Sequence, residues 1–138
     1  MKKAKVALVL LLAVMLVAGI ACTSLSLNNV SVDWDYEGIK YYLSNITFEL
    51  KNTGSSRARY DSVEIYANDE LVGSKDKVIF GAFDPGATHA FEFTRCMTGL
   101  ECLHEYSAYG QELIELKIII MDGSDIIATY SDTITPTQ

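Results

Sequence analysis

Basic side chains are scarce through most of this chain of 138 residues. Three of the 11 lysines and arginines lie in the first 21 positions, which hold no acidic residue, so residues 22–138 carry eight basic and 18 acidic side chains. The resulting formal charge of −10 disfavours a phosphate-binding surface, because proteins that bind nucleic acids neutralise phosphates with clustered lysine and arginine. We therefore expect no nucleic acid among the partners.

Residues suited to catalysis are also few. The chain has only two histidines, His89 and His104, and it lacks both a glycine-rich phosphate loop and a nucleophile grouped with a base. Asp33, Asp35 and Glu37 alternate along one segment, and on a strand such carboxylates stand roughly 6.5 to 7 Å apart, too far for a compact calcium site. We predict that the protein is not an enzyme and that it holds no cofactor and no metal ion.

One long apolar run stands at the N-terminus. Lys2, Lys3 and Lys5 precede 16 uninterrupted apolar residues, 6–21, and this order is typical of an export signal. As a helix the run would be about 24 Å long, short of the ~30 Å hydrocarbon core of a bilayer. We therefore predict that residues 1–21 form an N-terminal hydrophobic signal or anchor helix and that the chain is exported.

Three fates of this segment are open. Ala21 and Cys22 resemble the lipobox of lipoprotein signals, which implies a lipid on Cys22. Gly19 and Ala21 also suit a general signal peptidase, and an uncleaved helix would remain as an anchor. Residues 22–29 are then expected to be a tether to a folded domain over residues 30–138. We favour the lipid over free secretion or a retained helix, and hence a location at the cell membrane or cell surface.

Cys96 and Cys102 are the two cysteines left when Cys22 carries a lipid. In an oxidising compartment they predict a disulfide, worth about 2 kcal/mol, that staples a loop rather than the fold. The alternative is a zinc site, because His89 and His104 would complete a set of four ligands. We favour the disulfide, since the spacing of the four residues is irregular.

The rest of the chain consists of short stretches in which apolar and polar residues alternate, as is typical of strands with one buried face. Asn, Asp, Gly and Pro separate these stretches at intervals of roughly 8 to 12 residues. The predicted strands cover residues 30–37, 42–51, 58–67, 71–73, 77–80, 89–95, 113–121 and 126–134. We therefore predict an all-β fold, an antiparallel immunoglobulin-like β-sandwich of about seven strands.

Three details of these strands are specific predictions. Residues 113–121 are apolar on both faces, which predicts a central strand covered on both sides. Alternation places Tyr42 on the same face as Ile46, toward the core. It also places Ile126 and Ala128 on the inner face of the last strand.

Four short motifs mark turns and strands of this region. They are Asn52-Thr53-Gly54 after the strand from Thr47, the hairpin sequence of residues 63–72, Asp84-Pro85-Gly86, and Phe91-Glu92-Phe93. Together they resemble the CARDB family, the cell-adhesion-related sandwich domains of prokaryotic envelopes, over residues 41–135. The resemblance implies a non-catalytic envelope module for adhesion, spacing or assembly, with no catalytic residues to carry over.

Two groups of side chains are candidates for binding a partner. The connection over residues 96–110 is long for a sandwich, so we expect a binding loop there, or alternatively a cap that closes the sandwich. Tyrosines in the segment 58–67 fall on the face opposite Val63 and Ile65 and would be exposed. The candidate residues are Leu100, Leu103, His104, Tyr106, Tyr109, Tyr60 and Tyr66.

These inferences favour a non-catalytic, envelope-anchored β-sandwich that serves protein interaction, adhesion or surface assembly. Its expected partners are the membrane, through the lipid or the N-terminal helix, and an unidentified envelope protein or surface glycan. One alternative is an accessory subunit of a surface filament, secretion or transport apparatus that retains the N-terminal helix. Another is a small-solute binding protein that uses the tyrosine-rich loop.

Overall fold

The computed structural model describes residues 24–76, 82–96 and 101–137, and the regular structure in these ranges is all β. The strands are β1 (Leu25–Glu37), β2 (Lys40–Asn52), β3 (Ala58–Arg59), β4 (Ser62–Ala67), β5 (Glu70–Asp76), β6 (Ala82–Phe83), β7 (Thr88–Arg95), β8 (Cys102–Leu103), β9 (Ser107–Tyr109), β10 (Ile114–Asp122) and β11 (Asp125–Ile134). The predicted signal or anchor helix, Cys22 and the predicted strand over residues 77–80 lie outside the described residues. Within the described ranges, no helix is long and apolar enough to span a bilayer.

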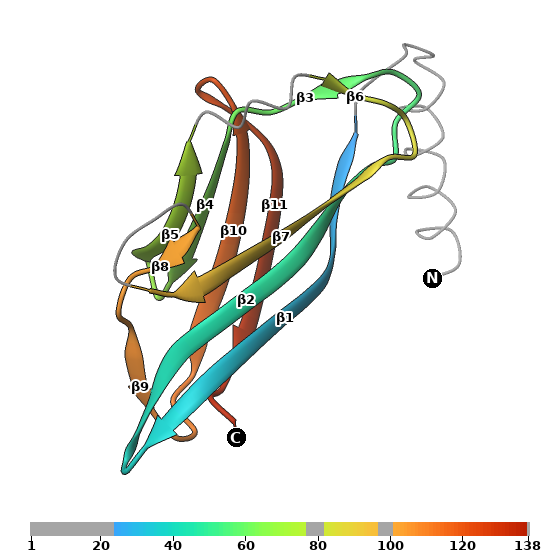
Figure 1. Ribbon diagram of the computed structural model, residues 1–138. Helices are drawn as coiled ribbons and strands as arrows, with labels where there is room; N and C mark the ends of the chain where they lie inside the picture. The colour runs from blue at the N-terminus through green and yellow to red at the C-terminus, as the bar shows by residue number, and fades with distance from the viewer. Residues whose placement is uncertain (1–23, 77–81, 97–100, 138) are drawn as a thin grey trace, which may run out of the picture.

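Nine of these strands form one hydrogen-bonded sheet that folds over into a β-sandwich (Figure 1). The order is β1-β2-β7-β8-β5-β4-β10-β11, with β9 paired to β2 beside this path, while β3 and β6 form a separate two-stranded sheet. β8 pairs with both β7 and β5, so it joins the half made of β1, β2 and β7 to the half made of β5, β4, β10 and β11. Val32 and Trp34 of β1 line a common hollow with Tyr130 and Ile134 of β11, so the sheet is nearly closed.

The predicted all-β sandwich is confirmed. Among the described strands, β1, β2, β4, β5, β7, β10 and β11 have at least six residues and correspond to predicted strands. The other four, β3, β6, β8 and β9, have two or three residues each. The stretch of residues 58–67, predicted as one strand, is divided into β3 and β4.

The inner faces of the two halves meet in one hydrophobic core. In the first half, Phe48 stacks on Phe91 and Phe93 with ring centroids 5.0 and 6.1 Å apart. In the second half, alternate residues of β10 from Ile114 to Ile120 are fully buried. Burying each such side chain contributes roughly 1.5–3 kcal/mol, so this alternation fixes which face of each strand points inward.

β1 begins at Leu25, earlier than the predicted start at Val30, because a β-bulge interrupts its alternation. Asn29 has a positive φ of 53°, and the register with β2 shifts at this point. Before the bulge Leu25 and Leu27 pack against the core, and after it Val30 and Val32 do so. Residues 25–29 therefore belong to the sheet, where the sequence predicts a tether.

Two further bulges correct the predicted inner faces. In β2 the register with β1 shifts at Ser44, so Leu43 is buried in place of Tyr42. In β11 the shift occurs at Ile127, which packs against the core, whereas Ile126 is 60% exposed. An extra residue on one strand reverses the inward and outward positions beyond it, and alternation alone does not reveal this.

β10 is covered on one face only. Ile114, Leu116, Ile118 and Ile120 are fully buried, but Leu113 just before the strand is 69% exposed, and Ile119 and Met121 are half-buried. The prediction of a central strand covered on both sides is therefore wrong. In a two-layer sandwich the outer face of each half meets solvent, whatever its residues.

The predicted turns are confirmed. Asn68 and Asp69 have positive φ values of 49° and 67°, as a two-residue type I′ turn between β4 and β5 requires. Pro85 precedes Gly86, whose φ is 85°, and Gly123 turns β10 into β11 with a φ of 65°. These turns set the register of the strands that they join.

Candidate binding surface at the tip of the sandwich

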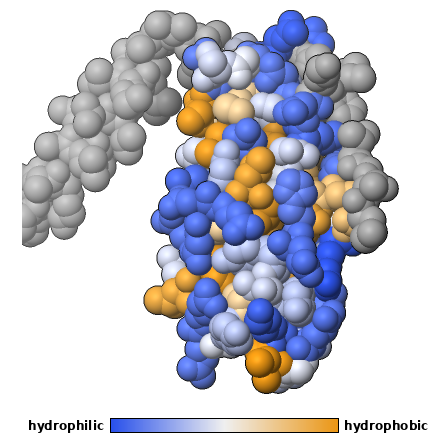
Figure 2. All heavy atoms as spheres, turned by 90° about the vertical axis from the view of Figure 1, so that its left-hand side faces the viewer, coloured by the Kyte–Doolittle hydropathy of each residue, from blue (hydrophilic) through white to orange (hydrophobic). Residues whose placement is uncertain are grey.

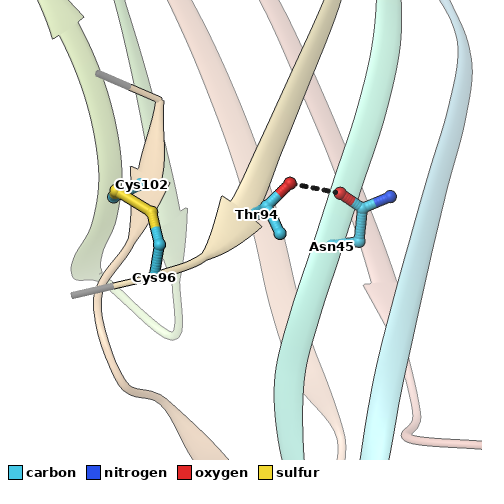
Figure 3. Close-up of a disulfide and its surroundings, with 4 residues drawn as sticks. All are labelled: Asn45, Thr94, Cys96 and Cys102. Carbon is cyan, nitrogen blue, oxygen red and sulfur yellow. Dashed lines mark hydrogen bonds between the residues drawn. A yellow bond between two sulfur atoms is a disulfide. The ribbon is translucent and has the colours of Figure 1, made fainter. Parts of the chain in front are cut away.

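A disulfide joins Cys96, just after β7, to Cys102 in β8 (Figure 3). The predicted pairing is confirmed, and the two sulfurs, bonded to each other, do not act as zinc ligands. Cys102 pairs with Thr94, whose hydroxyl donates a hydrogen bond to Asn45 Oδ1 at 3.2 Å. Nowhere in the described ranges do three His, Cys, Asp or Glu side chains gather as metal ligands would. The disulfide thus holds β8 beside β7.

Leu103 belongs to the core and not to the surface. It is 1% exposed, and a Cβ added at Gly73 would lie 3.2 Å from its side chain. Glycine at this position therefore lets β8 approach β5 closely. The prediction of a partner contact is wrong for Leu103, which instead caps the core.

Tyr106 is also packed inside, with 9% of the residue exposed. Its hydroxyl accepts a hydrogen bond from Asn68 Nδ2 at 3.3 Å, and its backbone oxygen accepts one from the Leu43 N–H at 2.9 Å. Burial raises the pKa of the hydroxyl, and the negative charge of Glu112 adds to this effect. The prediction of a partner contact is wrong for Tyr106, because its hydrogen bonds to Asn68 and Leu43, which are distant in the chain, hold it in the interior.

Of the remaining candidates in residues 96–110, two are exposed and one lies outside the described residues. His104 is exposed, and its N–H donates to the Val72 oxygen at 2.8 Å, which fixes β8 against β5. Tyr109 is 54% exposed. Leu100 lies outside the described residues.

Tyr60 is buried, contrary to the prediction, with 3% of the residue exposed. The strand predicted over residues 58–67 is interrupted here, between β3 and β4, so the Tyr60 side chain points toward the core. Its hydroxyl lies 2.6 Å from His89 Nδ1, and its ring packs edge-on against Phe83. Burial raises the pKa of the Tyr60 hydroxyl to about 12 and lowers the pKa of His89, so at neutral pH the bond joins a protonated hydroxyl and an uncharged imidazole.

Tyr66 faces away from the core, as predicted, but it is half-buried. Its hydroxyl donates a hydrogen bond to Glu64 Oε1 at 3.0 Å. This bond is the main cause of the raised pKa of Tyr66, and burial and the Glu64 charge add to it. Of the two tyrosines predicted for this region, Tyr66 is thus the one within reach of a partner.

Large hydrophobic side chains are exposed together at one end of the sandwich. Six such side chains are exposed among the described residues, and four of them lie at the β1–β2 turn, in β9 and at the start of β10. We call these four the tip surface: Tyr36 (48% exposed), Ile39 (73%), Tyr109 (54%) and Leu113 (69%). Figure 1 shows that these elements meet at the lower end of the molecule, and Figure 2 shows hydrophobic residues at that end.

Strand pairing fixes the backbone around the tip surface. Glu37 pairs with Lys40, which leaves Gly38 and Ile39 as the two residues of a tight turn, with a φ of 75° at Gly38. Lys40 in turn lies opposite Tyr109 of β9. Glycine at the first position is typical of a type II′ turn, but isoleucine at the second is unusual, because turn residues are mostly small or polar. This unusual turn is the sequence signal for Ile39 that alternation misses.

Side-chain contacts hold the tip surface in place. Tyr36 packs against Tyr41 with ring centroids 4.8 Å apart, and Lys40 Nζ lies 5.5 Å from the centre of the Tyr109 ring. Glu112 Oε1 accepts a hydrogen bond from the Tyr109 N–H at 3.0 Å. This bond fixes the loop between β9 and β10.

Acidic side chains lie beside the tip surface, where Asp35 and Glu37 flank Tyr36 in β1. Arg95 of β7 lies 3.7 Å from Asp35 and 3.4 Å from Glu37. The same guanidinium is 3.9 Å from Glu105 and stacks 4.7 Å from the centre of the Tyr42 ring. The three carboxylates stay more than half exposed, so these ion pairs contribute little to stability. One arginine faces these three carboxylates, and Lys40 and Glu112 both lie beside Tyr109. With four acidic and two basic side chains, the rim has a net negative charge.

The fold, rather than the sequence, is similar to known proteins. No family model matches the chain, and no match is found among curated proteins. Among solved structures, the chain is similar to a CARDB domain from Pyrococcus furiosus in complex with di-metal ions, with a TM-score of 0.54 and 10% identity over 85% of this chain and 96% of that one. It is also similar to β-glucosidase 3B from Thermotoga neapolitana in complex with glucose, with a TM-score of 0.39 and 11% identity over 82% of this chain and 16% of that one. The first similarity confirms the predicted CARDB-like fold.

Proposed function

We propose that this CARDB-like domain is a non-catalytic, immunoglobulin-like interaction module of the cell envelope, which contacts its partner through the tip surface. The observation that carries the proposal is the gathering of Tyr36, Ile39, Tyr109 and Leu113 at one end of the sandwich. A group of apolar side chains that is exposed at one place on a folded domain is typical of an interaction site.

The length of β1 separates the tip surface from the point where the chain enters the sandwich. β1 has 13 residues, so Leu25 and Glu37 are about 40 Å apart at ~3.3 Å per residue. In Figure 1, β1 starts toward the upper end and reaches the turn at the lower end. With a lipid on Cys22, or with the N-terminal helix retained, the tip surface would stand away from the membrane, within reach of an envelope protein or surface glycan.

The titratable groups that could serve catalysis take part in packing. Tyr60 is hydrogen-bonded to His89, and the His89 ring stacks on Phe83 with centroids 4.3 Å apart. Lys75 forms an ion pair with Glu101 at 2.5 Å, beside β8. Among the described residues, these groups take part in packing contacts of the sandwich, which supports a binding module over an enzyme.

The membrane anchor is tested by mass spectrometry of the N-terminal peptide, taken from membranes of cells that naturally make the protein. We expect Cys22 as the first residue, with the added mass of a diacylglycerol and an acyl chain. A peptide that begins at Met1 would favour the retained helix and, with it, an accessory subunit of a surface apparatus. An unmodified N-terminus found only in the medium would contradict anchoring.

The contact at the tip surface is tested with a photo-crosslinking amino acid at position 39, and at position 126 as the control. Ile39, in the β1–β2 turn, and Ile126, just after the β10–β11 turn, are 73% and 60% exposed, and these turns lie at opposite ends of the sandwich. Irradiation of intact cells should give an adduct of defined mass from position 39 only. No adduct from either position, or equal adducts from both, would contradict the proposed function.

A further inference from the structure

We infer that the partner of the tip surface is a protein that offers an apolar groove rimmed by lysine and arginine. This inference rests on the proposed function and adds the chemical class of the partner. Three observations carry it: the aliphatic character of the most exposed side chains, the protruding and rigid shape of the turn, and the negative charge around it.

The most exposed side chains of the tip surface are aliphatic. Ile39 and Leu113 are 73% and 69% exposed, more than either tyrosine. Sugar rings stack on flat aromatic faces beside hydrogen-bonding groups, and branched aliphatic side chains offer neither. The aromatic faces are also partly covered, because Lys40 lies over the Tyr109 ring and Tyr36 packs against a neighbouring tyrosine. The surface therefore suits an apolar protein groove better than a glycan.

The tip surface protrudes and is rigid. Ile39 stands at the outer end of a two-residue turn whose flanking residues, Glu37 and Lys40, pair with each other. Tyr109 is held by its pairing with Lys40 and by the hydrogen bond to Glu112. A preorganised protrusion buries most of its area in a concave partner, and its binding is opposed by little loss of conformational freedom.

The negative charge around the tip surface favours a protein groove over a lipid bilayer as the apolar partner. Asp35, Glu37 and Glu105 share Arg95, and Glu112 adds a fourth carboxylate beside Tyr109, where Lys40 is the second basic side chain. The net charge of this rim is negative. The surface of a bilayer that contains anionic lipids would repel such a rim. Lysine and arginine around an apolar groove would complement it, which speeds association and disfavours wrong partners.

The first step of the test identifies the adduct that forms from position 39 in intact cells. We expect a protein adduct that is missing from the control at position 126. An adduct with a lipid or a glycan would support the proposed function and overturn this inference. No adduct that depends on position 39 would overturn both.

The second step measures the affinity of the full-length protein for the purified crosslinked protein by titration calorimetry. Ile39→Asn should weaken binding at least about tenfold, because a few central anchors carry most of the binding energy. Asparagine suits a tight turn, and thermal unfolding verifies that the variant is folded. Ile126→Asn, the matched control, should change the affinity by less than about twofold. Equal affinities of the wild-type protein and Ile39→Asn would overturn the inference.

The third step tests the charge of the rim. Glu112→Gln keeps an acceptor oxygen for the Tyr109 N–H but removes the charge, so we expect affinity lower by about two- to fivefold. Glu92→Gln, exposed in the middle of β7, is the control and should leave the affinity unchanged. Raising NaCl from about 0.05 to about 0.5 M should weaken wild-type binding roughly tenfold. Salt-independent binding, or equal binding to phosphatidylcholine vesicles that contain phosphatidylglycerol, would overturn the inference.

Discussion

Tyr60 and His89 form a hydrogen-bonded pair beside the core. Replacing the tyrosine measures how much that bond contributes to the free energy of unfolding. Tyr60→Phe removes the hydroxyl but keeps the buried ring, so we expect the free energy of unfolding to fall by about 1 kcal/mol. Tyr66→Phe is the control, because its hydroxyl bonds Glu64 on the outer face, and its change should stay within about 0.5 kcal/mol. Urea denaturation measures both, and equal losses would contradict the role of the Tyr60 bond.

The lowered pKa of His89 predicts that stability depends on pH. Burial disfavours the charged imidazole in the folded state, so the unfolded chain, with a pKa near 6.5, takes up the proton first as the pH falls. The free energy of unfolding should therefore be highest above about pH 7 and decrease below the unfolded pKa. His89→Gln keeps a hydrogen-bonding side chain opposite Tyr60 but does not titrate, so the stability of this variant should vary less between pH 7 and lower pH. Parallel pH profiles of the two proteins, from urea midpoints, would rule this out.

Burial of single residues follows from the sequence where alternation is long, and not elsewhere. Alternation correctly places Phe91 and Phe93 in the core. It leaves Leu103, Tyr106 and Tyr60 on the surface, because each lies where the alternating pattern is short or broken. Their positions depend on Gly73, Asn68 and His89, which are distant in the chain, and neighbours in sequence carry no information about such contacts.

At the scale of elements, β8 has only two residues, yet the continuity of the large sheet depends on it. The sequence predicts that Cys96 and Cys102 staple a loop rather than the fold, but Cys102 belongs to β8, which pairs with both β7 and β5. Replacing both cysteines with serine should lower the free energy of unfolding by about 2 kcal/mol. Hydrogen exchange of the His104 N–H, which bonds the Val72 oxygen, should accelerate, while exchange in β10 should not. Unchanged exchange at His104 would show that β8 does not need the disulfide.

The turn between β4 and β5 depends on Asn68 in two ways. Its φ is 49°, and its side chain accepts a hydrogen bond from the Glu115 N–H at 2.8 Å and donates one to Tyr106. Asn68→Ala loses both contributions and should reduce the free energy of unfolding by about 2–3 kcal/mol. Asn68→Gly keeps the backbone freedom, so its loss should be smaller by about 1 kcal/mol. If the two variants unfolded at the same urea concentration, backbone strain would contribute nothing here.

The sequence predicts that the elements are strands. It predicts less well which residues of a strand face inward and how many strands there are. A bulge needs one inserted residue of no special type, so Ser44 and Ile127 give no signal, and Asn29 gives a weak one because asparagine tolerates a positive φ. β8 and β9 are too short for any periodic pattern. Their pairing with strands distant in the chain defines them.

At the scale of the whole molecule, net charge and the tip surface together predict behaviour in solution. The chain has a formal charge of −7 at pH 7 and a pI near 4.7, and without residues 1–21 the charge is −10, so repulsion between copies disappears as the pH falls toward the pI. We expect a monomer at pH 7 and association near the pI, measured by light scattering. Ile39→Asn combined with Leu113→Gln should reduce that association, while Ile126→Asn should not. The same association in all variants would contradict a role for the tip surface.

The CARDB-like fold follows from the sequence, because it depends on many strands and turns that agree with one another. The tip surface does not follow in the same way, and only Tyr109 is among its predicted residues. Alternation places Tyr36 inside, Ile39 lies in a turn, and Leu113 belongs to a face predicted to be covered. Their joint exposure arises where three elements end together, which only the assembled sandwich reveals.

β1 can carry tension between the two ends of the molecule. Its 13 residues run directly from the point where the chain enters the sandwich to the Gly38-Ile39 turn. A strand is already close to the full contour length of its backbone, at ~3.3 Å of at most ~3.6 Å per residue. A pull between an anchored N-terminus and a partner held at the turn would be borne by covalent bonds along β1. Apart from the bulge at Asn29, which can straighten, β1 could lengthen by less than about a tenth.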